Sequence, residues 1–282
     1  MRTVIFGEYK TGTTGLYKLL HHNYPKDNPR ELFEAKEYRA LPGDCEQGVL
    51  AKVIMPADSR YTHGKWWHWN KPTGIDSFRR FEKKLVLSRD PRDWFVSGLN
   101  FIPQQYPAIY NRKENRNRVL KLWSAKIEQP QKISCVQLFK DLMIMANEIE
   151  LSELNFLKSR YAKIIKFVNS LDHYFHIRYE DFIENKTQEL ENYLGFSLIT
   201  PAQDERWSHV ARAKVSGQWK DWFTQEDCEL LKPYLEPYMQ YWNYPNDWRL
   251  NPEPFIEEKH SLRYVEKTCC VKPKLNSADE KP

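Results

Sequence analysis

The most constraining feature of the sequence is a short apolar run that leads through a glycine-containing loop into a helical pattern. Residues 4–15 are VIFGEYKTGTTG, and the LYKLL that follows has the apolar spacing of a helix. Glycines let backbone N–H groups approach an anion closely, and the amino end of a helix adds a partial positive charge. Lys10 and the loop threonines supply further donors. The stretch therefore predicts a phosphate-binding loop, the alternative being a glycine-rich turn with solvated threonines.

This loop differs from the loop that binds nucleoside triphosphates. In that motif a lysine directly follows the last glycine, and the next hydroxyl group binds magnesium. Here Thr13 follows Gly12, and Lys10 precedes that glycine by two positions. The loop therefore predicts an anion site of another kind.

Composition limits the classes of protein that fit this loop. The chain has 282 residues, enough for one large domain or two small ones with an independent core. Its net charge of +5 is small beside a charged fraction of 29%, which argues against a nucleic-acid partner and favours local basic pockets. No apolar run approaches the ~18 residues of a membrane span, and no secretory signal is visible. Five cysteines without metal-ligand spacing are typical of reduced thiols, so we expect a soluble cytoplasmic protein.

Further apolar runs predict additional strands over residues 49–55, 85–89 and 174–179. Predicted helices cover residues 76–83, much of 91–169, 180–193 with Gly195 near its end, and 223–242, where Pro233 and Pro237 should break or kink the helix. Within the polar segment 23–48, Glu31, Glu34 and Glu37 have the spacing of a solvated helix face.

Strands that alternate with helices predict an α/β fold of three layers, with a central parallel sheet flanked by helices. Ligands of such sheets bind at the carboxyl ends of the strands, where Lys10, Lys52 and Arg89 fall. The pattern fades beyond about Asn251. We therefore expect a main domain over residues 1–250 and a C-terminal extension over 251–282, the last part of which is disordered.

Two further stretches place basic residues where they could join the same site. Arg89 ends a predicted strand, and Ser97 lies two turns into the helix that begins near Pro91. An arginine and a serine so placed can hold one phosphate from two sides. The alternative is a surface arginine paired with Asp93 and a serine inside a helix. Near the C-terminus, RAKVSGQWK at 212–220 offers a third basic loop or, alone, only a charged turn.

Together these stretches resemble the cytosolic and glycan sulfotransferases that use 3′-phosphoadenylyl sulfate (PAPS). KTGTT at 10–14 is similar to the family's Lys-Ser-Gly-Thr-Thr loop, which holds the 5′-phosphosulfate. Arg89 and Ser97 match the family's strand-end arginine and the serine eight residues later, which hold the 3′-phosphate. YEDF at 179–182 resembles the Tyr-Glu-Asp segment whose tyrosine reaches the adenine, and 212–220 is similar to a further loop around the 3′-phosphate. The four motifs occur in the family's order between residue 2 and about residue 245.

The resemblance implies a P-loop-like sulfotransferase fold over residues 1–250. It implies an enzyme that moves the sulfuryl group of PAPS to a hydroxyl acceptor, carbohydrate-like or another small molecule, and releases 3′-phosphoadenosine 5′-phosphate (PAP) without a metal. The implied cofactor-binding residues are Lys10, Thr11, Gly12, Thr13, Thr14, Arg89, Ser97, Tyr179, Arg212, Lys214 and Gly217.

Three departures from the family pattern bear on this implication. Gly15 stands where an aromatic residue usually follows the Thr-Thr pair, so a stacking contact on adenine is lost or supplied elsewhere. Ala213 and Lys214 replace a Lys-Gly pair, and Lys214 adds charge. Ile54 stands where the small-molecule enzymes carry the histidine that acts as general base, and isoleucine cannot accept a proton.

The general base must therefore come from elsewhere. The glycan branch of the family uses a glutamate shortly after the first helix, and Glu34 best fits that placement. Glu31 and Glu37 are competitors, as are His63 and His68 in a tryptophan-rich loop. Lys10 would stabilise charge on the leaving phosphate, and Lys52 either faces the sulfuryl group or extends from a strand end to solvent.

Two other functions remain open at this point. A nucleotide-dependent phosphotransferase would need magnesium-binding carboxylates, and no acidic residue ends the predicted strands over 49–55 and 85–89 before Asp90. A non-catalytic nucleotide-binding relative is the other alternative, because the usual histidine is absent. Trp66, Trp67 and Trp69 either stack on the acceptor or pack an irregular loop. The sequence leaves the acceptor and the oligomeric state open.

Overall fold

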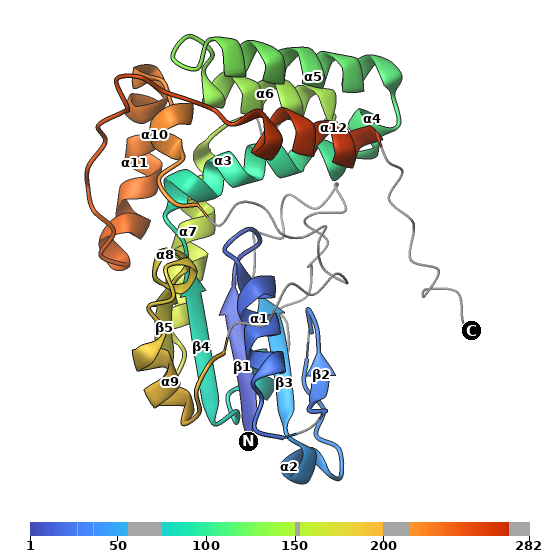
Figure 1. The fold of residues 1–282 in the computed structure, drawn as a ribbon, viewed down its shortest axis with the longest axis vertical. Helices are drawn as coiled ribbons and strands as arrows, with labels where there is room; N and C mark the ends of the chain where they lie inside the picture. The colour runs from blue at the N-terminus through green and yellow to red at the C-terminus, as the bar shows by residue number, and fades with distance from the viewer. Residues whose placement is uncertain (27, 36, 56–74, 150–152, 200–214, 271–282) are drawn as a thin grey trace.

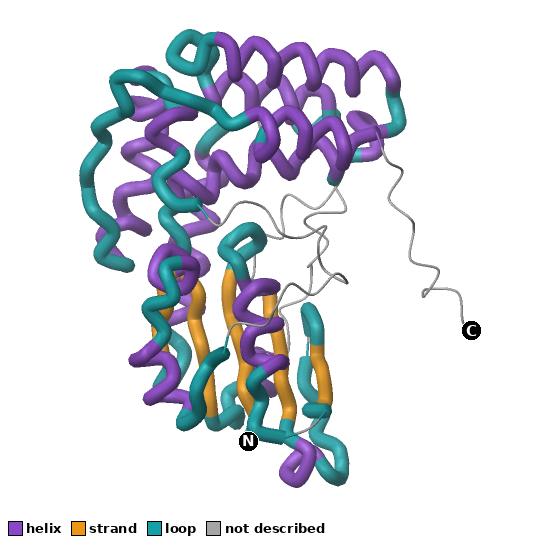
Figure 2. Tube along the Cα trace, in the orientation of Figure 1, coloured by secondary structure: helices purple, strands orange, loops and turns teal. Residues whose placement is uncertain are grey.

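A parallel sheet lies in the lower half of the molecule as it is drawn in Figures 1 and 2. The computed structural model describes residues 1–26, 28–35, 37–55, 75–149, 153–199 and 215–270. Within them the strand order is β2-β3-β1-β4-β5, and every adjacent pair is parallel. The strands are β1 (Arg2–Gly7), β2 (Arg30–Leu32), β3 (Val49–Ile54), β4 (Lys83–Ser88) and β5 (Phe175–Arg178).

Helices cover both faces of the sheet. Alternate residues of a strand point to opposite sides, so a central strand places apolar side chains against both helical layers. Ile5 of β1 packs with Leu16 and Leu20 of α1 on one face. Phe6 lies on the other face, where its ring centroid is 5.2 Å from that of Phe167 in α7. The predicted α/β fold with a parallel sheet flanked by helices is confirmed.

A group of helices lies beyond the carboxyl ends of the strands, above the arrowheads in Figure 1. The described α-helices are α1 (Thr13–His22), α2 (Asp44–Gln47), α3 (Pro91–Phe101), α4 (Pro107–Tyr110), α5 (Lys113–Glu128), α6 (Cys135–Met145), α7 (Asn155–Asn169), α8 (Tyr179–Ile183), α9 (Gln188–Leu194), α10 (Trp219–Trp222), α11 (Gln225–Tyr241) and α12 (Leu262–Cys270).

Most predicted elements are present, and the exceptions have local causes. The glutamates of segment 23–48 do not share a helix: β2 takes up Arg30–Leu32, and Glu34 lies in the turn after it with a φ of 54°. The predicted helix over 76–83 is also wrong, because only a 3₁₀ turn forms over Ile75–Phe78 and Lys83 already starts β4. A charged, helix-like spacing was outweighed in both places by pairing with the sheet.

Two helical predictions change in detail. The segment predicted as one helix over 180–193 is divided into α8 and α9, and Gly195 caps the second with a φ of 86°. Conversely, α11 is assigned as one helix through Pro233 and Pro237. A capping box of Thr224 and Asp227 begins it, and its packing against α7 supports the turns that the prolines weaken.

The chain beyond Asn251 adds one helix that was not predicted. Val265 in α12 is fully buried, and α12 packs against α5 and the 3₁₀ turn Ile102–Gln104. The described part of the C-terminal extension therefore contributes to the same core.

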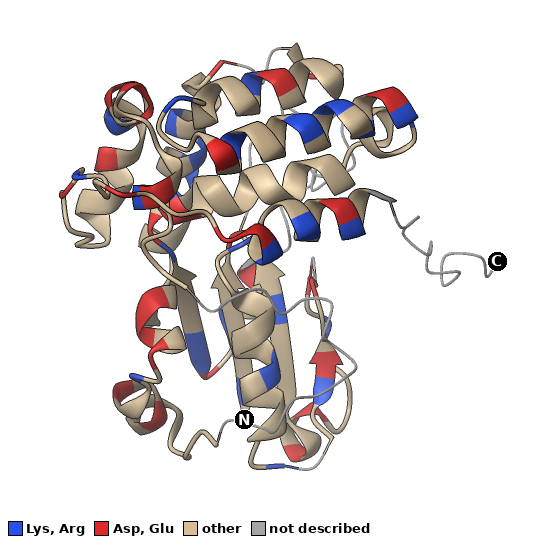
Figure 3. Cartoon of the chain, turned by 45° about the horizontal axis from the view of Figure 1, so that its top comes forward, with Lys and Arg blue, Asp and Glu red and all other residues tan. Residues whose placement is uncertain are grey.

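Charged positions are not confined to the helices. Figure 3 shows acidic and basic positions interspersed along the helices, and the strands carry charged residues too, among them Lys52 in β3 and Lys83 in β4. Among the described residues, no helix has both the length and the apolar character needed to cross a membrane.

Candidate functional site

The loop between β1 and α1 has two residues in the left-handed backbone region. Lys10 has a φ of 65° and Gly12 a φ of 92°. A Cβ on Gly12 would lie 2.5 Å from the ring of Tyr179, so only glycine fits at this close approach. The loop is therefore packed directly against the start of α8, at the carboxyl end of β5.

Three successive carbonyl groups of this loop are hydrogen-bonded to side chains. The Oγ1 of Thr11 donates to the carbonyl of Glu8 over 2.7 Å, and Trp94 Nε1 donates to the carbonyl of Tyr9 over 2.7 Å. Arg89 Nη1 donates to the carbonyl of Lys10 over 2.8 Å. Since the C=O and N–H of one trans peptide point in opposite directions, these bonds also fix where the following N–H groups point.

Arg89 links the loop to the end of β5. Only 7% of the residue is exposed, and its guanidinium carbon lies 4.4 Å from the ring centroid of Tyr179. The Nε of Arg89 is buried and has no hydrogen-bond partner among the described residues. The alternative of a surface arginine is therefore wrong, and the unused buried donor is suited to an anionic ligand.

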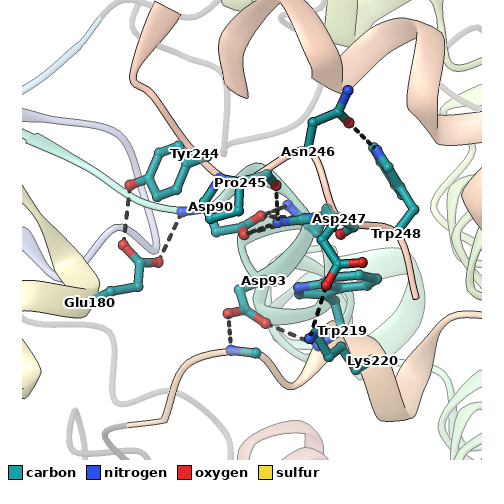
Figure 4. A network of polar contacts seen from close by, with 12 residues as sticks. Asp90, Asp93, Glu180, Trp219, Lys220, Tyr244, Pro245, Asn246, Asp247 and Trp248 are labelled. Carbon is teal, nitrogen blue, oxygen red and sulfur yellow. Dashed lines mark hydrogen bonds and ion pairs between the residues drawn. The ribbon is translucent and has the colours of Figure 1, made fainter. Parts of the chain in front are cut away.

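The third basic loop is joined to the helix after Arg89 (Figure 4). The carboxylate of Asp93 in α3 accepts hydrogen bonds from the backbone N–H of Gly217 at 2.5 Å and of Trp219 at 3.0 Å. Burial raises the pKa of Asp93 to about 6, and the positive charge of Arg89 opposes that rise. Ser97 lies further along α3 and is 7% exposed.

Other members of the predicted motif have structural roles or lie outside the described residues. Trp219 is 2% exposed, and the guanidinium of Arg92 lies 4.1 Å from the centroid of its ring. Lys220 forms a 3.8 Å ion pair with Asp247. The predicted residues outside the described ranges are Arg212, Lys214, His63, His68, Trp66, Trp67 and Trp69.

Of the three candidate glutamates, Glu34 is the one connected to the phosphate-binding loop. Lys52 Nζ lies 2.8 Å from Glu34 Oε1 and 2.9 Å from Thr14 Oγ1, in the first turn of α1. The side chain of Lys52 is 3% exposed and that of Glu34 is 32% exposed. Burial lowers the pKa of Lys52, and the charge of Glu34 opposes this shift. The backbone carbonyl of Lys52 also accepts a hydrogen bond from the backbone N–H of Ala35. Lys52 therefore holds the turn through both its side chain and its backbone.

The other two glutamates have different surroundings. Glu31 accepts a hydrogen bond from Tyr17 at 2.9 Å and lies 3.1 Å from His21, both on α1. Glu37 is paired with Arg39 at 2.7 Å, and both side chains are more than half exposed. Ile54, at the position where the sequence resemblance would place a histidine, is 6% exposed within the core.

Two aromatic contacts at the loop were not predicted from the sequence. Lys10 Nζ lies 3.8 Å from the ring centroid of Phe101, the last residue of α3. A Cβ on Gly15 would lie 3.4 Å from Phe182 in α8. An aromatic ring from α8 therefore lies beside the position at which the family pattern has its own aromatic residue.

The hydrogen bonds of Asp93 and Trp94 were not predicted, because nothing in their local sequence indicates that these side chains bond to backbone groups far along the chain. Asp93 binds an N–H group 124 positions away, and Trp94 binds a carbonyl 85 positions away. The Asp-Pro-Arg-Asp-Trp stretch after a strand was the only available signal.

No family model matches the sequence, and no curated protein matches it. Among solved structures, that of mouse sulfotransferase SULT7A1 complexed with PAP is similar with a TM-score of 0.44 and 11% sequence identity, over 95% of this chain and 89% of that chain. A likeness at that level carries no weight for function, which rests on the site residues.

Proposed function

We propose that the protein is a PAPS-dependent sulfotransferase that transfers the sulfuryl group to a hydroxyl acceptor and releases PAP. The observation that carries the proposal is the meeting of three separate motifs at one edge of the sheet. Arg89 at the end of β4 donates to the carbonyl of Lys10 and lies over the ring of Tyr179. Tyr179 in turn packs against Gly12.

The nucleotide would be held from two sides. The loop N–H groups, the hydroxyls of Thr13 and Thr14, and the helix dipole of α1 suit the 5′-phosphosulfate, while the Thr11 hydroxyl is used to hold the loop through the Glu8 carbonyl. Arg89, whose buried Nε has no hydrogen-bond partner in the described part of the chain, suits the 3′-phosphate together with Ser97 and the loop that Asp93 holds at Gly217. Arg212 and Lys214 belong to this group by resemblance, and Tyr179 would lie near the adenine.

PAPS supplies a sulfuryl group joined to phosphate through an anhydride bond, so the protein's task is positioning and charge stabilisation. Lys10 and the loop N–H groups would stabilise the negative charge that develops on the phosphate oxygen as the bond breaks. Glu34 would accept the proton of the acceptor hydroxyl. Lys52 holds Glu34 beside Thr14, which places the carboxylate next to the phosphate-binding loop and keeps its oxygen oriented.

The direct test compares ligands of the purified protein by calorimetry. PAP should bind at least about tenfold more tightly than AMP, because the 3′-phosphate adds charged hydrogen bonds of about 1.5–3 kcal/mol each. Thermal stabilisation by PAP should exceed that by ATP with magnesium. The reverse order would favour a phosphotransferase. Release of labelled PAP from PAPS with an acceptor library would then separate an enzyme from a non-catalytic nucleotide-binding relative.

A further inference from the structure

Glu8 and Arg160 form a buried ion pair at the start of the phosphate-binding loop. Arg160 Nε lies 2.6 Å from Glu8 Oε1, and the two side chains are 3% and 2% exposed. Burial raises the pKa of the Glu8 carboxyl group, and the Arg160 charge opposes that rise. The desolvation cost of such a pair offsets much of its attraction, so fold stability alone explains its presence poorly.

The pair reaches the loop by two routes. Glu8 itself provides the carbonyl that accepts hydrogen bonds from the hydroxyl and backbone N–H of Thr11, at 2.7 and 3.4 Å. The guanidinium of Arg160 also lies 4.7 Å from the ring centroid of Trp94, and the Trp94 indole donates to the carbonyl of Tyr9. Arg160 is therefore linked to two successive loop residues, one directly and one through Trp94.

The loop needs such support because of its backbone. Lys10 follows Tyr9 and has a φ of 65°, a conformation that is unfavourable for a residue with a side chain. A residue in this region keeps its conformation only when the surrounding structure holds it. The residues on either side of Lys10 are held by hydrogen bonds. The Thr11 hydroxyl donates to the carbonyl of Glu8, and the Trp94 indole donates to the carbonyl of Tyr9.

We propose that Glu8 and Arg160 are positioning residues that hold residues 8–11 in their anion-binding conformation. They act through the backbone and do not touch the ligand. The proposal rests on the proposed function in that the bound anion is a phosphate group of PAP.

The test uses Glu8→Gln and Arg160→Lys in the full chain, with hydrogen exchange followed in the apo protein and PAP affinity measured by calorimetry. Glu8→Gln removes the charge at nearly constant shape, whereas Arg160→Lys keeps the charge but loses the planar guanidinium. We expect amides of residues 9–16 to exchange about tenfold faster in Glu8→Gln, with amides of α6 much less affected. PAP affinity should fall by about tenfold, with Arg160→Lys intermediate.

Asp227→Asn is the matched control. Asp227 is also a fully buried carboxylate, but it accepts hydrogen bonds from Ser134 and from the backbone N–H groups at the start of α6. This variant should lower the melting temperature without a selective change in loop exchange or PAP affinity.

The outcomes separate the two proposals. If loop exchange in Glu8→Gln rises no more than exchange in α6, the positioning role is wrong. If the wild-type protein does not bind PAP but Glu8→Gln still loosens the loop selectively, the positioning role stands and the proposed function is wrong. If Glu8→Gln does not fold, Arg160→Lys decides by the same comparison.

Discussion

The two halves of the candidate site are held in different ways. The phosphate-binding half is fixed from several elements, with Arg89 and Trp94 bonded to loop carbonyls and both side chains nearly buried. The half that carries Glu34 belongs to a turn after a three-residue strand, and Glu34 is held through Lys52. On the proposed function the first half would hold the nucleotide, whereas the second offers a partly exposed carboxylate to the acceptor. Loss of the Glu34 carboxylate should therefore affect chemistry, and loss of Arg89 should affect binding.

The largest expected effect comes from Glu34→Gln. Turnover should fall by at least about a hundredfold, the usual contribution of a general base, while PAP affinity stays close to wild type. The melting temperature should fall, because buried Lys52 loses its charged partner, but the protein should remain folded at the assay temperature. Glutamine keeps a hydrogen-bond acceptor for Lys52, so the turn is expected to remain in place. The measurement is steady-state turnover of labelled PAPS.

Glu31→Gln and Glu37→Gln are the controls, because they lie on the same segment but contact α1 or solvent. Each should lose less than about tenfold. If His63→Ala or His68→Ala were inactive while Glu34→Gln kept its activity, the general base would lie in the tryptophan-rich loop. Glu34 would then have no catalytic role, and the two halves of the site would not divide binding from chemistry.

The strand, loop and helix of the phosphate-binding half could be predicted from the sequence because their signals are local. A strand, a glycine loop and a helix follow one another between Arg2 and His22, and Arg89 directly follows its strand. The base segment could not be predicted in the same way, since three glutamates at helical spacing suggested a helix that the structure replaces with β2 and a turn. Only the pairing of β2 with β3 brings Glu34 next to Lys52, and that contact depends on residues 18 positions apart. Asp93, Trp94 and Arg160 act on residues still further away, so no local pattern marked them.

Arg89→Ala tests the phosphate-binding half with the next largest effect. The variant should weaken PAP by at least about tenfold and bring its affinity close to that of AMP, because a charged donor to the 3′-phosphate is lost. AMP binding should change less. Calorimetry with both nucleotides provides the measurement.

Arg178→Ala is the matched control for Arg89→Ala. Arg178 ends the neighbouring strand β5 but is partly exposed and paired with Asp181. An equal loss of PAP and AMP affinity in Arg89→Ala would mean that Arg89 only supports the loop through the Lys10 carbonyl.

The smallest effect concerns Asp93 and appears as a dependence of stability on pH. Burial raises the pKa of Asp93 in the folded protein to about 6, above the usual range of an aspartate. A carboxyl group with a raised folded-state pKa contributes stability that is fully present at low pH and is lost as the pH rises through 6. Between pH 5 and pH 7 this contribution should fall by about 1 kcal/mol. The melting temperature of the wild type relative to Asp93→Asn should therefore drop by about 2–4 °C over that interval.

Asp93→Asn also weakens the bonds to the backbone N–H groups of Gly217 and Trp219, so it should be less stable than the wild type at pH 5. A difference between the two proteins that stays constant from pH 5 to pH 7 would mean that Asp93 is already ionised across this range, and that the phosphate-binding half gains its order from the charge of Arg89 more than from burial.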